Sequence, residues 1–328
     1  MSVMSRRFVV LLVVAVGAGL VGCATTVTTA VLRPALINAQ PYGGTMTVGE
    51  FRGDSYEWNG IAADIRQRIR EAIVRCPNGV VRFMEGGAGL TVFGRVADYT
   101  YREAVTEQRD TCTRTEGSGS NRREVRYACV HYTRNGQANV RVIFNVADGT
   151  GQTIAAKTYE LSDSAITRAT DQPPAGIDGE GMLRGLAYGL TDGFLRVVIP
   201  WWDTVALPFW DCGDAPECAR GIALVQSGQW EQAIQAFDEA AGRIQATPES
   251  DPEDLAEAYW NKALAQQYSN DFAGAVISCS TALQYDPANS DYAAQLQEIQ
   301  RSQAEAEALR QQGIGTGTSD NVQQGGTP

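Results

Sequence analysis

The first part of the chain alternates between helical and strand-like hydrophobic patterns. Residues 61–75 carry isoleucine at every fourth position, and residues 181–198 carry apolar side chains at helical spacing. Each of these segments predicts an amphipathic helix with one buried face. Short runs in which apolar and polar residues alternate predict strands at residues 45–51, 80–84, 90–101 and 154–161.

The clearest strand pattern lies at residues 125–146, where Val140, Val142 and Phe144 alternate with polar residues. Asn135-Gly136 interrupts this segment, and this residue pair favours the tight type I′ turn of a β-hairpin. The pattern therefore predicts two strands, residues 125–134 and 137–146, joined at Asn135-Gly136. With the two helices packed on one sheet, residues 42–210 are expected to form an α/β, sandwich-like domain with a mostly antiparallel sheet.

Residues 256–289 resemble a tetratricopeptide repeat, a pair of antiparallel helices about 34 residues long. Small residues and a turn stand at the positions expected for this repeat: Ala263, Asn270-Asp271-Phe272, Ala275, Cys279, Ala282 and Pro287. A second copy at residues 214–246 carries Gly221, Trp230, Ala233, Phe237 and Ala240. Two repeats leave apolar ends, so residues 291–310 are expected to form a capping helix within a helical domain of residues 211–310.

The resemblance to tetratricopeptide repeats implies a groove, lined by the first helix of each repeat, that binds extended or helical peptides. The residues at those positions are Ile222, Val225, Gln226, Trp260, Asn261, Leu264 and Gln267. The alternative is that these side chains contact the α/β domain or the C-terminal helix of the same chain. The sequence favours neither interpretation. The predicted fold class is α+β, an α/β domain followed by all-α repeats, with a disordered tail at residues 311–328.

The first 22 residues have the features of a signal peptide, a basic start and a short apolar run. Leu20-Val21-Gly22-Cys23 resembles the bacterial lipobox, which implies cleavage before Cys23 and acylation of that cysteine. An uncleaved membrane anchor is the alternative, but the apolar run is short for a spanning helix. Ala24 is not the aspartate associated with inner-membrane retention, so we expect an outer-membrane lipoprotein with a tether at residues 23–41.

The α/β domain resembles the curli-secretion lipoproteins and the related penicillin-binding-protein activator lipoproteins. The resemblance rests on residues 47–51, the helix that follows them, residues 90–96 and the turn at residues 148–151. Curli pores add hairpins that span the outer membrane, and a spanning strand needs a row of apolar residues facing lipid. Residues 97–115 carry charged side chains on both alternating faces, which disfavours a pore.

Charge and composition argue against several further classes of function. The chain has 27 basic and 38 acidic residues, a formal charge of −11, which argues against nucleic acid as a partner. Its single histidine, His131, disfavours His-cluster metal sites and His-based acid–base chemistry. No nucleophile–base pair is visible, so we expect no enzyme activity, no metal and no cofactor other than the lipid on Cys23.

Six cysteines remain besides Cys23, and an oxidising compartment favours disulfides between them. Cys112 and Cys129 flank a polar turn and are expected to bond across two strands, and Cys212 and Cys218 close a short loop. Nearby, Trp201, Trp202, Phe209 and Trp210 form an aromatic cluster. This cluster predicts packing between the two domains or, alternatively, an anchor for a partner.

These features together predict a lipoprotein of the outer membrane, lipid-anchored and facing the periplasm. Its expected role is a protein–protein interaction scaffold in an envelope assembly, secretion or cell-wall complex. The membrane would be contacted only through the lipid, and the partners would be proteins of the cell envelope. The alternative function is a subunit or accessory of a curli-type secretion pore.

Overall fold

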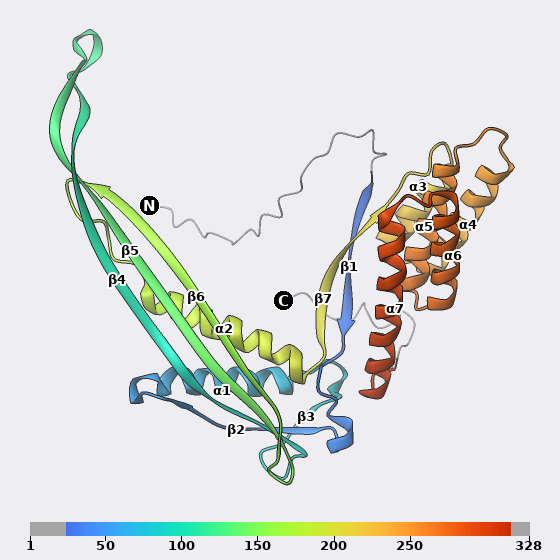
Figure 1. Ribbon diagram of the computed structural model, residues 1–328, viewed down its shortest axis with the longest axis horizontal. Coiled ribbons are helices and arrows are strands. Elements are labelled where there is room, and N and C mark those ends of the chain that lie inside the picture. The colour runs from blue at the N-terminus through green and yellow to red at the C-terminus, as the bar shows by residue number, and fades with distance from the viewer. Residues whose placement is uncertain (1–23, 316–328) are drawn as a thin grey trace. The chain divides into compact units, whose positions relative to one another are not determined.

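The computed structural model describes residues 24–315 and is an α+β structure (Figure 1). Strands dominate the N-terminal half of the chain, and helices dominate the C-terminal half. The described residues divide into two compact units. The sheet unit comprises residues 31–203 and 304–315, and the helical unit comprises residues 24–30 and 204–303.

The sheet unit is built on a five-stranded sheet of order β3-β2-β4-β5-β6. Its strands are β2 (Thr45–Gly53), β3 (Arg82–Phe83), β4 (Leu90–Glu116), β5 (Arg123–Asp148) and β6 (Thr153–Thr170). β2 runs parallel to β3 and β4, whereas β4, β5 and β6 form an antiparallel meander. The sheet is therefore mixed, with its longest pairings antiparallel.

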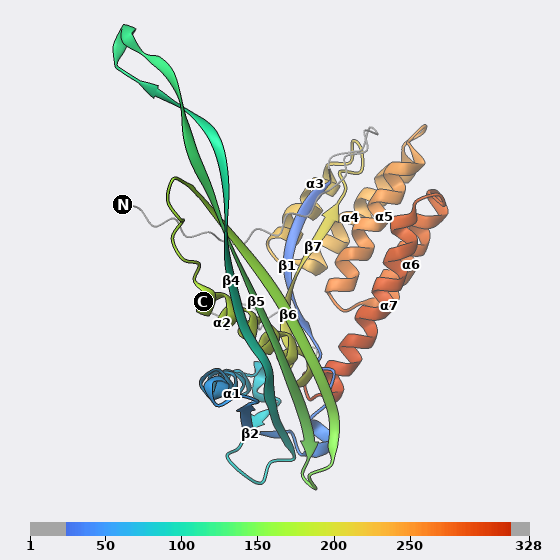
Figure 2. The same ribbon diagram turned by 60° about the vertical axis from the view of Figure 1, so that its left-hand side comes forward.

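Two helices, α1 (Asn59–Val74) and α2 (Gly179–Val198), pack on one face of this sheet (Figures 1 and 2). The four-residue isoleucine repeat of α1 is fully buried, and it meets the inward-facing residues of β4 and β5. Phe144 of β5 stacks on Phe194 of α2 with ring centroids 4.3 Å apart. The alternation along residues 138–146 thus separates a buried face from an open one.

The predicted turn at Asn135-Gly136 is wrong. β5 runs without interruption through both residues, and Asn135 pairs with Ala104 of β4 and with Ile166 of β6. The chain reverses instead at residues 117–122, where Gly117 and Gly119 adopt positive φ angles. Pairing on both sides of β5 outweighs the local turn preference, because each residue of a central strand gains ladder hydrogen bonds on two edges.

The segments predicted as a tether and as a disordered tail both contain ordered structure. Within residues 24–41, β1 (Thr25–Arg33) pairs with β7 (Trp201–Phe209) in a second, two-stranded sheet. At the other end, the Gln312 side chain accepts a hydrogen bond from the Ala35 amide at 3.1 Å and donates one to the Ala35 carbonyl at 2.8 Å. Neither interaction is local in sequence, so composition alone could not predict it.

The helical unit contains consecutive helices. They are α3 (Pro216–Gln226), α4 (Trp230–Ala246), α5 (Pro252–Tyr268), α6 (Phe272–Tyr285) and α7 (Ser290–Gln311), whose residues from 304 onward belong to the sheet unit. Helices α3 to α6 pack on their neighbours in chain order, and Ile299 of α7 shares an apolar cluster with Cys279 of α6. Alanines and Gly221 let the helices approach closely: a Cβ placed on Gly221 would lie 2.4 Å from the Phe237 ring. None of the helices within residues 24–315 is long and apolar enough to cross a membrane.

Short 3-10 turns complete the connections. They are η1 (Gln40–Tyr42), η2 (Tyr56–Trp58), η3 (Pro77–Gly79) and η4 (Gly119–Asn121).

Candidate functional site

The residues predicted to line a peptide groove contact a segment of the same chain. The Asn261 side chain of α5 accepts a hydrogen bond from the Trp210 amide at 2.9 Å and donates one to the Trp210 carbonyl at 2.7 Å. The Trp260 indole donates to the Pro208 carbonyl at 2.9 Å. Asn261 and Trp260 therefore hold an extended backbone, as a peptide groove would, and that backbone is the end of β7 and the residue after it.

The other predicted groove residues divide between the core and the surface. Ile222, Val225 and Leu264 are buried in the apolar cluster that contains Phe209. Gln267 donates to the Ser302 hydroxyl at 2.8 Å and accepts a hydrogen bond from Gln295, both on α7. Gln226 is exposed. Three of the seven positions, Trp260, Asn261 and Gln267, thus form hydrogen bonds to the end of β7 or to the C-terminal helix, which is the kind of contact in the second interpretation.

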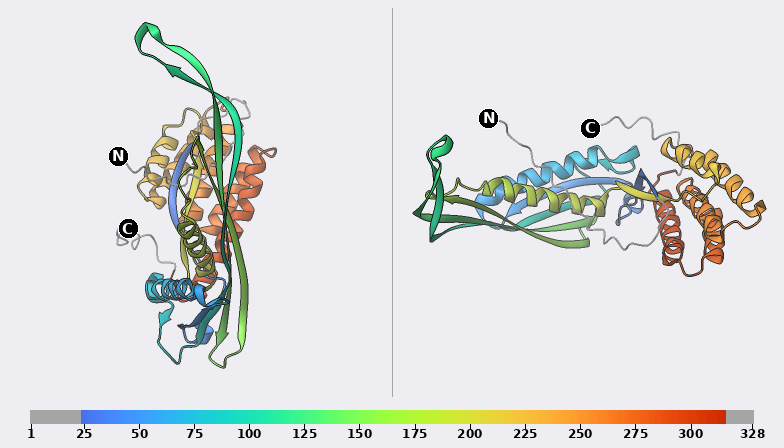
Figure 3. Two further views of the ribbon diagram at one scale, coloured as in Figure 1. Left: turned by 90° about the vertical axis from the view of Figure 1, so that its left-hand side faces the viewer. Right: turned by 90° about the horizontal axis from the view of Figure 1, so that it is seen from above.

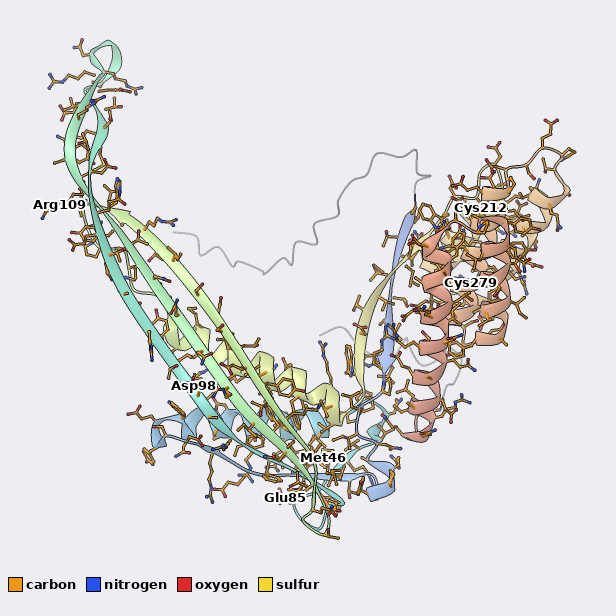
Figure 4. All side chains as sticks on the ribbon, viewed as in Figure 1. Met46, Glu85, Asp98, Arg109, Cys212 and Cys279 are labelled. Atoms are coloured by element: carbon orange, nitrogen blue, oxygen red, sulfur yellow. A yellow bond between two sulfur atoms is a disulfide. The ribbon has the colours of Figure 1, made fainter. Side chains whose placement is uncertain are left out.

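A disulfide and a half-buried carboxyl lie beside this occupied face. Cys212 and Cys218 form a disulfide, and the Asn261 side chain lies 3.2 Å from the Cys212 sulfur (Figure 4). The Cys212 amide donates to the Glu257 carboxyl at 3.0 Å. Burial, with a smaller contribution from nearby Asp254, raises the pKa of Glu257 to about 7. Sequence reasoning missed Glu257, although its place four residues before Asn261 puts both on one helix face.

The four residues of the predicted aromatic cluster do not pack together as one cluster. Phe209 is fully buried and stacks on Phe237 at 5.9 Å, and Trp210 is half-buried on the helical core. The Arg196 guanidinium lies 4.2 Å from the ring centroid of Trp201, whereas Trp202 is 55% exposed. Because β7 is a strand, neighbouring side chains point to opposite faces, and a run of adjacent aromatics cannot all face one core.

The most extended surface of the sheet unit is the far end of β4 and β5, where β6 accompanies β5 only as far as the pairing of Thr170 with His131 (Figure 3). We call residues 98–116 and 123–139 the ribbon; Figure 4 labels Asp98 near its base and Arg109 further along β4. β2 stops pairing with β4 at Val96. Within the described residues, the outer edge of β4 along the ribbon and the outer edge of β6 have no paired strand.

Tyr99, Tyr101 and Ala138 pack on the core at the base of the ribbon, and beyond them charged and other polar side chains occupy both faces. A disulfide between Cys112 and Cys129 joins its strands, as the flanking polar turn predicts. Arg134 forms an ion pair with Glu103, and Arg114 pairs with Glu116 at 2.7 Å. The ribbon is thus a polar element with a disulfide between its strands and an open backbone edge on β4. It has three strands up to the pairing of His131 with Thr170 and two strands beyond it. The predicted lipid-attachment site, Cys23, lies outside the described residues.

Comparisons with known proteins give little further information. No family model matches the chain, and no curated protein matches it. Among solved structures, the chain is similar to a PelC dodecamer subunit from Paraburkholderia phytofirmans, with 12% sequence identity. That match covers 53% of this chain and 99% of the other, at a TM-score of 0.25, so no conclusion about function is drawn from it.

Proposed function

We propose that the protein is an outer-membrane lipoprotein, anchored through Cys23 and facing the periplasm, that acts as a protein–protein interaction scaffold. The complex it serves would assemble, secrete or build part of the cell envelope. The sequence from Leu20 to Cys23 supports a lipid anchor. The resemblance to curli-secretion and penicillin-binding-protein activator lipoproteins supports a role in the cell envelope. The scaffold role is independent of any catalytic group.

The observation that carries this proposal is the pair of open backbone edges on β4 and β6. Unpaired strand edges expose N–H and C=O groups that another strand can pair with, and proteins normally protect or use such edges. Along the ribbon, the edge of β4 continues from Asp98 to Glu116. Exposed polar side chains keep this edge soluble when it is alone, and backbone pairing would still give a partner affinity.

We further propose that α3 with α4, and α5 with α6, are two tetratricopeptide repeats. The supporting features are their helix–turn–helix order and the buried small residues Gly221, Ala233, Ala263 and Ala275. Their inner face binds Pro208 and Trp210 of the same chain. We therefore assign partner binding to the ribbon and treat the repeats as a structural support.

A second candidate function, a subunit or accessory of a curli-type secretion pore, is favoured by one feature. Beyond Val96, where pairing with β2 ends, the sheet has an open edge on each side, at β4 and at β6. The β4 edge of one copy of the chain could therefore pair with the β6 edge of another. The charged residues on both faces of the ribbon count against insertion in lipid.

Site-specific photocrosslinking in intact cells separates these functions. A photoreactive residue is placed at Thr113 on β4 or at Ser162 on β6, with Gln67 on the exposed side of α1 as the matched control. The scaffold role predicts crosslinks from Thr113 or Ser162 to a different envelope protein, identified by mass spectrometry, and none from Gln67. Crosslinks only between copies of this chain would favour the pore subunit, and no crosslinked protein at either edge would contradict both.

A further inference from the structure

The only histidine of the chain lies beside the disulfide of the ribbon. His131 Nε2 is 3.6 Å from the Cys112 sulfur and 3.8 Å from the Cys129 sulfur. The same nitrogen is 3.9 Å from a carboxylate oxygen of Asp110. Two cysteines, a histidine and an aspartate are the ligand types that zinc uses most often. Among residues 24–315, Cys112, Cys129 and His131 are the one group of three potential metal ligands whose atoms lie close together, and Asp110 lies next to this group.

The ladder explains why these four residues converge. Asp110 pairs with Cys129, and Cys112 pairs with Tyr127, in the register of β4 and β5. Residues two apart on a strand share a face, so Asp110 and Cys112 stand next to Cys129 and His131 on one side of the ribbon. The cluster is therefore fixed by backbone pairing and not by the disulfide alone.

The distances from the imidazole nitrogen to the two sulfurs match those between ligands of one zinc ion. In a tetrahedral site with Zn–N near 2.0–2.1 Å and Zn–S near 2.3 Å, a nitrogen and a sulfur lie about 3.5 Å apart. The two observed nitrogen–sulfur separations, 3.6 and 3.8 Å, are close to this value. Two adjustments are needed. The two sulfurs, which share a covalent bond, would have to separate to about 3.8 Å, and the Asp110 carboxylate, whose oxygen is 3.9 Å from Nε2, would have to turn towards the other three ligands.

The imidazole is also oriented as a metal ligand would be. Its Nδ1 lies 3.1 Å from the Thr170 hydroxyl, at the last residue of β6. Zinc-binding histidines almost always donate the second ring N–H to such an acceptor, which fixes the tautomer and directs the other nitrogen at the metal. Asp171 supports this arrangement, because its amide donates to the Val130 carbonyl at 2.7 Å and its carboxyl accepts from the Val130 amide at 3.0 Å.

We propose that Cys112, Cys129, His131 and Asp110 form a zinc site that replaces the disulfide when the ribbon is reduced. The reductant is a protein dithiol: it is oxidised to its own disulfide, and the Cys112–Cys129 bond is converted to two thiols. One Zn²⁺ then binds both sulfurs and releases their two protons, while His131 Nε2 and an Asp110 oxygen donate lone pairs. The strands of the ribbon are thus joined by a covalent bond when oxidised and by a metal when reduced.

This site departs from the expectation of no metal. That expectation rested on the presence of a single histidine. A zinc site made of two cysteines, one histidine and one carboxylate needs only one histidine. The half-buried position of Cys112 leaves one sulfur within reach of an attacking thiolate, while Cys129 is only 2% exposed. The proposal does not depend on the scaffold function.

The test uses the full-length chain, purified in detergent, before and after treatment with a phosphine reductant. Each sample is incubated with Zn²⁺, passed through a desalting column and assayed for metal per chain. We expect about one zinc per reduced chain and none per oxidised chain. With Co²⁺ as the probe, the reduced chain should show thiolate-to-cobalt charge-transfer and tetrahedral d–d absorption bands.

Matched variants locate the metal. Cys112→Ser with Cys129→Ser should abolish binding, whereas Cys212→Ser with Cys218→Ser should leave it unchanged. Thr170→Val, which removes the orienting acceptor, should weaken zinc binding about 10- to 100-fold, and His131→Ala should weaken it further. Circular dichroism checks that each variant is folded.

Three results would overturn the proposal. They are reduced wild type without stoichiometric zinc, zinc retained by the folded Cys112→Ser, Cys129→Ser variant, and His131→Ala with unchanged affinity. In each case the Cys112–Cys129 bond would be a structural disulfide only.

Discussion

Asn261 holds both backbone groups of Trp210, accepting from its amide at 2.9 Å and donating to its carbonyl at 2.7 Å. The two residues are 51 positions apart in the sequence. This contact ties the segment after β7 to α5, and it fills the position that the sequence predicts as part of a peptide-binding groove. The side chain that the sequence marked as a ligand contact is, in the structure, a support for the fold.

Asn261→Ala should therefore destabilise the helical unit. The change removes the partners of one N–H and one C=O that are partly shielded from solvent, and an unsatisfied buried group costs about 1–3 kcal/mol. We expect a loss of about 2–3 kcal/mol in the free energy of unfolding, measured by urea titration of tryptophan fluorescence. Gln226→Ala, at an exposed position of α3, is the control. Equal stability of both variants would mean that Asn261 is not a support.

Two glycines in neighbouring helices should respond to alanine with opposite signs. At Gly221 an added Cβ would meet the Phe237 ring at 2.4 Å, so Gly221→Ala should lower stability by about 1–3 kcal/mol through overpacking. At Gly242 of α4 the new Cβ would meet nothing within 4 Å. Gly242→Ala should raise stability by about 0.5–1 kcal/mol because alanine favours helix. The same sign for both changes in thermal unfolding would refute close packing of α3 on α4.

The stability of the helical unit should depend on pH through Glu257. Burial raises its pKa from 4.5 to about 7 in the folded chain. The folded state therefore binds the proton more tightly than the unfolded state does. The stabilisation is complete below the unfolded pKa and is lost as the pH rises through the folded pKa of about 7.

Glu257→Gln should remove this part of the pH dependence, because glutamine stays neutral and can still accept from the Cys212 amide. Thermal melting between about pH 5 and pH 8 measures the effect. Wild type should lose stability across this range more steeply than Glu257→Gln, with the exposed Glu231→Gln as control. Parallel curves for all three proteins would argue against a Glu257 whose pKa is raised by its half-buried position.

Lipidation is tested at Cys23. Cys23→Ser leaves no thiol to acylate, so metabolic labelling with a fatty-acid analogue should disappear and the protein should leave the outer-membrane fraction. A single acyl chain anchors only marginally, and stable anchoring needs the two or three chains expected for a lipoprotein. Labelling that persists in the variant would rule out Cys23 as the attachment site.

The sequence by itself determined the local features of this protein. The four-residue repeat of isoleucine fixes α1 and its buried face, since helical geometry alone brings those side chains together. The alternation before Asp148 fixes which face of β5 is buried, and the spacing of Cys112 and Cys129 around a polar turn is enough to predict their pairing. Each of these depends only on residues close in the chain.

Tertiary structure decided the rest, wherever a distant segment competes with a local preference. Asn135-Gly136 favours a turn, but pairing with β4 and β6 on both edges keeps it extended. The Asn261 side chain could bind any extended backbone. The residue after β7 binds there because it belongs to the same chain, which gives it a high effective concentration. His131 acquires its neighbours only through the register of the ribbon. Contacts between residues far apart in the chain depend on which pairing lowers the free energy most through burial and hydrogen bonding. A local sequence pattern carries no information about the competing distant segments.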